Sequence, residues 1–265
     1  MIGGDRLSSI AVSWPFSYLA WMDIEARDEM RRLVTPPDPL ELDGAILDPH
    51  WVIEALTPHL TPGRIKRIDR VLDGRTFNVA TVVEGLQDTG NMAAIMRSAE
   101  AFGFQPFHVI TTAGKYKMST RTTQGANKWL DVYRWADVEA CVSNLREHGY
   151  RILATYVGEG AEPIESFDFT ERTAVVFGNE PDGVSPELLE MADARTVIPT
   201  PGFVESFNVS AAAAVCLHHA YRSRVARGLH GDLTDRERQR MRAAFFVHST
   251  RHAEKLLRHA LSVSE

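Results

Sequence analysis

Continuous apolar runs, separated by stretches with helical periodicity, organise the middle of the chain. The runs are rich in β-branched and aromatic residues and lie at 77–83, 107–111, 152–157, 174–177 and 196–198. The stretches with helical spacing of apolar residues lie at 92–102, 138–148, 186–192 and 209–226. Strands that are apolar throughout, rather than at alternate positions, are typical of a sheet buried on both faces. The pattern therefore predicts an α/β fold with a mostly parallel sheet covered by helices on both faces.

Helical patterns also flank this region. A Thr-Pro pair at Thr61 begins a basic stretch with apolar residues at helical spacing, which predicts a helix over 61–75. A helical pattern at 23–33 precedes it, and another at 234–263 predicts one long helix or two broken ones.

Three prolines at 36, 37 and 39 favour a boundary near residue 40. Because the basic helix is predicted to begin at Thr61, we divide the chain into an acidic N-terminal extension of unknown role, a main domain that starts with this helix and a C-terminal helical extension, with the bounds 1–60, 61–230 and 231–265.

The distribution of charge matters more here than its total. The net charge is −6, which is unusual for a protein that binds nucleic acid over its whole surface. Residues 1–60 hold ten acidic and four basic side chains, so the rest of the chain is balanced. Two basic clusters in the rest could follow a phosphate backbone, namely Arg64, Lys66, Arg67 and Arg70, and Arg222, Arg224 and Arg227. Each cluster fits a solvated helix face equally well.

Cysteine usage and hydropathy indicate the compartment. The two cysteines, Cys141 and Cys216, lie in apolar segments without a CxxC or Cys/His cluster, which predicts neither a disulfide nor a metal site. Ser13, Pro15 and Ser17 interrupt the apolar stretch at 10–22, and no run approaches the roughly 20 residues of a membrane span. We expect a soluble, cytoplasmic protein.

The first candidate site segment, 84–103, follows the first apolar strand of the main domain. Asn91 lies at or near the start of the next helix, where asparagine often serves only as a cap. Arg97 lies six residues further on, among alanine, isoleucine and methionine. A helix of this composition suits burial, and a buried arginine needs a partner. Of the two residues, Arg97 is therefore the one that a purely structural role explains less well.

Two further polar segments follow later strands. Glu180 lies between Gly178 and Gly183, a pattern that by itself indicates only a turn. Ser206 and Asn208 precede an alanine-rich helix whose free N-terminal amides suit a polar or anionic ligand, although a tightly packed capped helix has the same pattern. All three segments follow the carboxyl ends of strands, where α/β enzymes place their sites.

In order and spacing, the three segments resemble the motifs of the SpoU (TrmH) family of RNA 2'-O-ribose methyltransferases. The matching elements are Asn-x5-Arg-x5-Gly from Asn91, Gly-x-Glu-x-x-Gly-Val-Ser from Gly178, and Ser-x-Asn-Val-Ser-x-Ala-Ala-Ala from Ser206. The resemblance covers roughly residues 61–230. It is nearest to the tRNA branch, which methylates a D-loop guanosine, and includes the Asn-Lys-Trp at 127–129 and the Arg-x-Arg of Arg222 and Arg224.

The resemblance implies methyl transfer from S-adenosyl-L-methionine (SAM) to a ribose 2'-hydroxyl of RNA, in a homodimer with a C-terminal trefoil knot and without a metal. The implied catalytic residues are Asn91, Arg97, Glu180, Ser206 and Asn208. The positions that match SAM contacts are Thr155, Gly178, Ile198 and Phe207. The implied RNA contacts are Arg64, Arg67, Lys128, Arg222 and Arg224. Since arginine keeps its positive charge at neutral pH, Arg97 would orient and polarise the hydroxyl with help from a substrate phosphate.

Two positions depart from the family pattern. The loop at 85–90 lacks the His/Pro-rich sequence typical of tRNA members, and Phe207 replaces a usual leucine. A ribosomal-RNA 2'-O-methyltransferase, including one of the resistance type, and a non-catalytic RNA-binding protein with this fold remain alternatives. A dinucleotide-binding dehydrogenase is disfavoured, because no GxGxxG follows a first strand.

Overall fold

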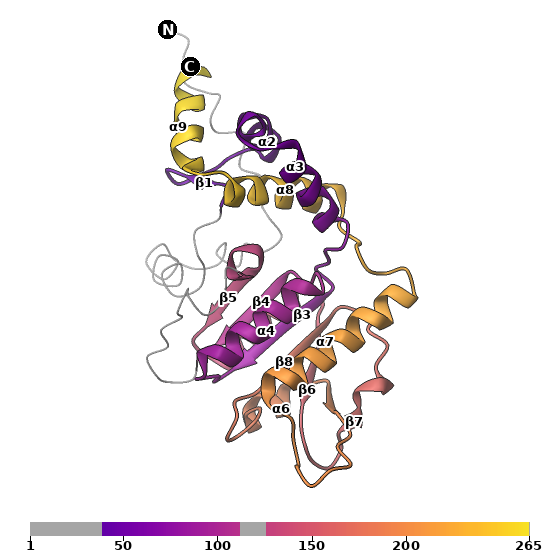
Figure 1. Ribbon diagram of the computed structural model, residues 1–265. Coiled ribbons are helices and arrows are strands. Elements are labelled where there is room, and N and C mark those ends of the chain that lie inside the picture. Colours follow the sequence, from indigo (N-terminus) through magenta and orange to yellow (C-terminus); the bar gives the residue numbers. More distant parts are fainter. Residues whose placement is uncertain (1–38, 112–125, 265) are drawn as a thin grey trace. The chain divides into compact units, whose positions relative to one another are not determined.

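The computed structural model describes residues 39–111 and 126–264 and divides into two compact units (Figure 1). One unit combines residues 39–73 with 233–264, and the other extends from 74 to 232. The helix predicted at 23–33 lies outside the described residues. In this division the basic helix packs with the flanking helices, whereas the sequence pattern predicted it as the start of the main domain.

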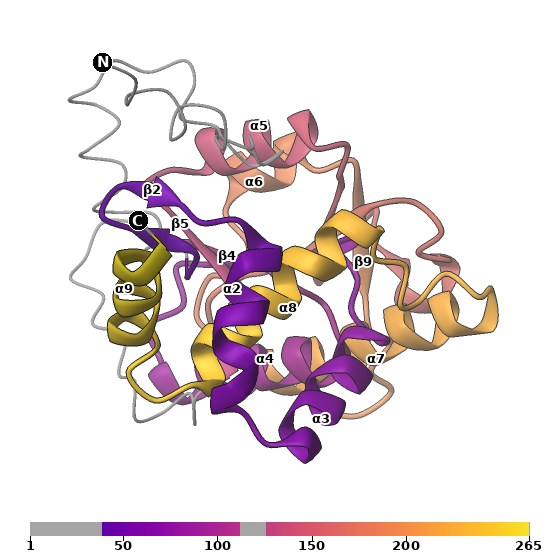
Figure 2. The same cartoon turned by 90° about the horizontal axis from the view of Figure 1, so that it is seen from above.

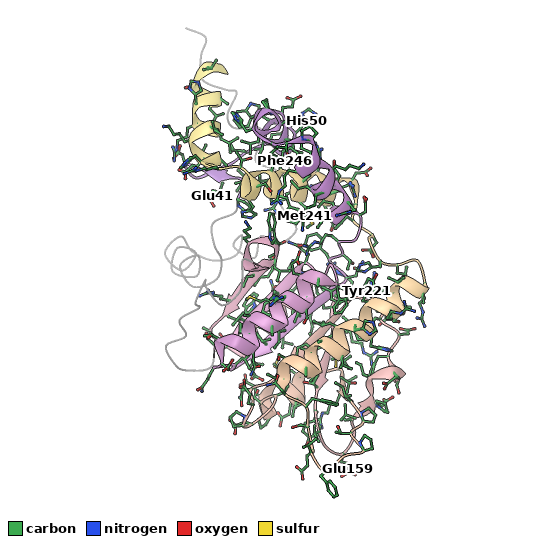
Figure 3. All side chains as sticks on the ribbon, viewed as in Figure 1. Glu41, His50, Glu159, Tyr221, Met241 and Phe246 are labelled. Carbon is green, nitrogen blue, oxygen red and sulfur yellow. The ribbon has the colours of Figure 1, made fainter. Side chains whose placement is uncertain are left out.

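The first unit is helical, with α2 (Pro49–Leu56), α3 (Pro62–Leu72), α8 (Asp235–Ser249) and α9 (Ala253–Ser264). The short elements β1 (Glu41–Leu42), β2 (Ala45–Ile46) and η2 (Thr57–His59) complete it. Helix α8 contacts the other three helices and buries Met241 and Phe246, which Figure 3 labels. The predicted C-terminal segment is thus two helices, and the break at 250–252 includes His252 in the left-handed region, with φ 57°.

A seven-stranded sheet forms the centre of the second unit. Its order is β5 (Asp131–Trp135), β4 (Pro106–Ile110), β3 (Val79–Glu84), β8 (Thr173–Phe177), β6 (Arg151–Thr155), β9 (Ala194–Val197) and β7 (Glu162–Pro163). Every neighbouring pair is parallel, which confirms the predicted sheet. The edge strand β5 was not predicted, because Asp131 and Arg134 interrupt its apolar residues, which form no continuous run.

Helices cover both faces of this sheet, as predicted. Helices α4 (Thr89–Ala101) and α7 (Val209–Ala226) lie side by side on one face (Figure 1). Helices α5 (Val138–Glu147) and α6 (Pro186–Met191) lie on the other (Figure 2). Two apolar cores result, one on each face of the sheet. Two short 3-10 helices lie in the connections, η3 (Ala126–Trp129) before β5 and η4 (Ile164–Ser166) between β7 and β8.

The sheet order determines where the loops meet. Strands β3, β8, β6 and β9 are consecutive neighbours and parallel, so their carboxyl ends lie at one edge. The loops at 85–88, 178–185, 156–161 and 198–208 all leave from this edge. Glu159, labelled in Figure 3, belongs to the loop after β6. None of the helices in the described ranges combines the length and apolar character that a membrane span requires.

Candidate functional site

Three of the predicted catalytic side chains meet in one hydrogen-bonded network at the carboxyl edge of the sheet. The Asn91 side-chain amide donates through Nδ2 to Oε1 of Glu180, at 2.6 Å. The Asn208 amide donates through Nδ2 to Oδ1 of Asn91, at 3.2 Å. Each residue comes from a different sequence motif, so the three segments do converge in space.

Asn91 is available for this network because a neighbour caps its helix. Asp88, and not Asn91, is the N-cap of α4, and its Oδ1 accepts the Asn91 backbone amide at 2.7 Å. The cap is close-fitting, since a Cβ on Gly90 would lie 2.9 Å from the same oxygen. The predicted capping role of Asn91 is thus taken by Asp88, and the Asn91 side chain faces its two partners.

The loop that carries Glu180 is closed on itself. Asn179 and Gly183 exchange two backbone hydrogen bonds, at 3.1 and 3.0 Å. Gly178 is required there, because a Cβ at this position would lie 1.9 Å from the carbonyl carbon of Gly183. Gly183 has a φ of 71°, in the region that favours glycine. The two glycines therefore hold Glu180 in a tight turn.

Asn208 is oriented by Ser210, a residue that was not among the predicted site residues although its motif contains it. Asn208 is the N-cap of α7, and its Oδ1 accepts from the Ser210 backbone amide at 2.9 Å and from Ser210 Oγ at 2.6 Å. With its oxygen so occupied, the Asn208 amide must direct its nitrogen toward Asn91. Donors thus run in one direction, from Ser210 through Asn208 and Asn91 to Glu180.

Arg97 and Ser206 lie outside this network. Arg97 is exposed on α4 and forms no hydrogen bond or ion pair with the described part of the chain, so the expectation that it is buried with a partner was wrong. It lies about 9 Å further along the helix axis than Asn91 and roughly a third of a turn around it. The buried stripe of α4 consists of Met92, Ala93, Ile95, Met96 and Ala99. Ser206 is exposed in the loop before α7.

The four positions matched to SAM contacts gather at the same edge. Thr155 ends β6 and donates its hydroxyl to the Val176 carbonyl at 2.9 Å, Gly178 follows β8, and Ile198 follows β9. Phe207, in the loop after β9, is 44% exposed, and Val157, after β6, is 60% exposed. Backbone groups and exposed apolar side chains are therefore available together at this edge.

The predicted RNA contacts have different surroundings. Arg67, Lys128 and Arg222 are exposed, and the Lys128 ammonium lies 4.6 Å from the centroid of the adjacent Trp129 ring. Arg64 is half-buried and donates through Nε to the Ser249 hydroxyl at 3.1 Å.

Arg224 corrects the prediction that it contacts phosphate, because its guanidinium is 1% exposed and bonded within the chain. It donates to the carbonyls of Phe169 and Leu229 at 2.9 and 2.5 Å, and to Asp232 Oδ2 at 2.6 Å. Burial lowers the pKa of Arg224, and the Asp232 carboxylate acts in the opposite direction. Arg224 therefore secures the turn after α7 and the segment before β8. Within the described ranges, no cluster of histidine, cysteine and acidic residues could hold a metal ion.

Comparison with known proteins places all three motifs within one matched region. The model of the SpoU rRNA Methylase family matches residues 78–218. A tRNA (guanosine(18)-2'-O)-methyltransferase of Thermus thermophilus is 36% identical over 170 residues, which cover 64% of this chain and 88% of that relative. The Escherichia coli protein of the same name is 30% identical over 186 residues, covering 69% and 81%. The crystal structure of the Aquifex aeolicus TrmH/SpoU tRNA modifying enzyme is similar with a TM-score of 0.65 and 30% identity, covering 70% of this chain and 96% of that one.

Proposed function

Because this chain belongs to the SpoU rRNA Methylase family, we propose that it methylates the ribose 2'-hydroxyl of RNA with SAM, at a D-loop guanosine of tRNA. The Glu180–Asn91–Asn208 network carries the proposal, since it unites the three motifs at one edge of the sheet. The relatives named above as tRNA enzymes match over most of their own length. A cytoplasmic location, where tRNA is found, is part of this proposal.

SAM would be held by the loops that leave β6, β8 and β9. Bound there, SAM supplies a methyl group activated by a positively charged sulfur. The residues fit such a ligand, because Val157 and Phe207 offer exposed apolar surface to a flat base while the loop backbone offers polar groups. Glu180 lies in the loop after β8, which is one of these three loops, so its carboxylate belongs to the edge of the sheet where SAM would bind.

The side chains of the network would position the ribose, and Arg97 would act on its hydroxyl. Methyl transfer requires the 2'-oxygen to be aligned with the methyl group and to lose its proton. Arg97 has no partner within the described chain, so its guanidinium is free to contact the hydroxyl and a neighbouring phosphate. The phosphate is the better proton acceptor, because arginine remains charged at neutral pH.

Labelled SAM tests the proposed function directly. The protein is incubated with labelled SAM and either total tRNA or ribosomal RNA, and the label is located by nuclease digestion. We expect the label in tRNA, at a D-loop guanosine. Label confined to ribosomal RNA would favour the ribosomal alternative, and a protein that binds no SAM by calorimetry would be a non-catalytic RNA binder.

Exposed basic residues would hold the tRNA backbone. Replacing Lys128 or Arg67 by alanine should weaken tRNA binding and reduce the slope of log affinity against log salt by about 1 in each case. The turnover at saturating tRNA should not change. Arg146→Ala is the control, because Arg146 already pairs with Asp193 at 3.2 Å. A salt slope that equals that of the wild type in both variants would refute these contacts.

An exposed apolar surface supports a homodimer as part of the proposal. Phe203, Val204 and Phe207 are exposed before α7. On α7 itself, the apolar side chains of Ala211 and Val215 are exposed about one turn apart, and that of Val225 is exposed ten residues further on. Exposed apolar patches mark interfaces.

Val215→Arg should convert the dimer to a monomer, because a charge in an apolar interface is not compensated. Light scattering after size-exclusion chromatography measures the mass directly. Ile46→Arg, at an apolar residue that is 40% exposed in the helical unit, is the matched control and should leave the mass unchanged. A Val215→Arg protein of dimer mass would contradict this interface.

The path of the chain after β9 supports the trefoil knot. Strand β9 lies beyond β6 in the sheet, whereas α7 packs against α4. Residues 198–208 therefore cross back along the carboxyl edge before α7 begins, and we propose that they form the threaded segment. A crystal structure whose chain path closes without a knot would contradict this.

A further inference from the structure

A buried carboxylate, Glu84, lies beneath the site and has no role in the proposed chemistry. It is the last residue of β3 and is 2% exposed. Its Oε2 accepts the backbone amide of Ser185 at 2.9 Å. Its Oε1 is also buried, and no group among the described residues donates to it.

This arrangement does not favour stability. A carboxylate removed from water needs several donors to offset the loss of hydration, and Glu84 has one amide. The residues around the partner amide, Val184 and Leu188, belong to the apolar core between the sheet, α5 and α6. Glu84 therefore contributes through the position in which its single hydrogen bond holds Ser185.

The hydrogen bond fixes the far end of the loop that carries Glu180. Ser185 closes this loop and also caps α6, since its hydroxyl accepts the Leu188 amide at 3.2 Å. At the other side of the loop, Asn91 donates to Glu180 at 2.6 Å. Glu84 and Asn91 belong to the same strand–loop–helix segment, so residues 84–91 hold the loop at two points.

From this geometry we infer that Glu84 is a positioning residue, which keeps residues 178–185 in the place where Glu180 meets Asn91. The inference rests on the proposed methyl transfer. Glu84 acts through the Ser185 amide and does not itself touch the reacting groups. Loss of this anchor lets the loop move relative to α4, and a displacement of about 1 Å at a reacting group can cost up to about a hundredfold in rate.

The unpartnered Oε1 makes glutamine an informative replacement. In Glu84→Gln the amide oxygen still accepts the Ser185 amide, and the new NH2 group takes the place of an oxygen that had no donor. The anchor remains while the charge is removed. In Glu84→Ala the anchor itself is lost.

The test compares methyl-transfer kinetics of these two variants. Glu84→Ala should lower kcat about tenfold or more with an unchanged KM for tRNA, and should speed amide hydrogen exchange within residues 178–185. Glu84→Gln should restore both to within about threefold of the wild type. Thr173→Val is the stability control. It removes a buried hydroxyl that donates to the backbone carbonyl of Glu171 at 3.1 Å, at the opposite edge of the sheet from the site.

A double-mutant cycle separates positioning from general destabilisation. If Glu84 acts through Glu180, adding Glu84→Ala to Glu180→Gln should slow the reaction by less than about twofold further. If the rate losses of Glu84→Ala and Glu180→Gln multiply in the double variant, the two residues act independently and the inference is overturned. A Glu84→Gln protein as slow as Glu84→Ala would also overturn it. A wild-type protein without methyl transfer would instead refute the proposed function, and faster exchange at 178–185 in Glu84→Ala would still report on the anchor.

Discussion

Replacing Arg97 by alanine is expected to slow methyl transfer by about a hundredfold or more, while SAM and tRNA still bind. The expected loss matches that seen when one preorganised donor to a developing negative charge is removed. Arg97 is exposed and makes no hydrogen bond or ion pair with other described residues. Its removal therefore should not disturb the fold, and the free energy of unfolding should change by less than about 0.5 kcal/mol.

Two controls sharpen the Arg97 experiment. Arg97→Lys keeps the positive charge but loses the planar fork that can contact a hydroxyl and a phosphate together, so it should restore little activity. Arg251→Ala removes an exposed arginine from the helical unit and should turn over like the wild type. Single-turnover rates at saturating SAM and tRNA are the measurement, and an Arg97→Ala protein with full turnover would refute the assigned role.

Arg224→Ala is expected to destabilise the protein by about 3 kcal/mol, the lower end of the usual cost of breaking a buried ion pair by removing one partner, because the Asp232 side chain is 27% exposed. The substitution leaves Asp232 without its cation and takes a donor from the carbonyls of Phe169 and Leu229. Urea unfolding followed by circular dichroism measures the change, provided that the midpoint shifts without a change in slope.

Arg222→Ala is the matched control for this prediction. Arg222 lies two residues earlier on the same helix but is exposed, so its removal should change the free energy of unfolding by less than about 0.5 kcal/mol. If Arg224→Ala unfolds like the wild type and instead lowers the salt dependence of tRNA binding, the role assigned to its buried guanidinium is wrong.

The fold was predictable wherever each element carries its own pattern. Strands β3, β4 and β8 are buried along their length and β6 is buried in its middle, and all four appear in the sequence as apolar runs. Strand β5 lies at the edge of the sheet and has no continuous apolar run, so the same criterion missed it. The amphipathic pattern of α3 shows that one face is buried, but not against which partner, so the sequence could not show that this helix packs against α8.

The sequence predicted which residues form the site better than it predicted how buried each of them is. The order of the motifs brought together Asn91, Glu180 and Asn208, which the network confirms as neighbours. The burial of Arg97 and Arg224 was not predicted correctly, although helix geometry could have indicated that of Arg224. Residues two apart on a helix point to roughly opposite sides, so Arg222 and Arg224 could not both face solvent. Glu84 was missed because its importance comes from Ser185, which is 101 residues away in sequence.

The most direct test of the proposed function removes one oxygen atom from the substrate. A tRNA that carries 2'-deoxyguanosine at the D-loop guanosine labelled in the labelled-SAM assay, and is otherwise unmodified, is compared with the all-ribose tRNA in that assay. We predict that the ribose form gains one methyl group, recovered as 2'-O-methylguanosine by nucleoside mass spectrometry, and that the deoxy form gains none. Equal labelling of the two tRNAs, or a methyl group recovered on a base, would contradict the account.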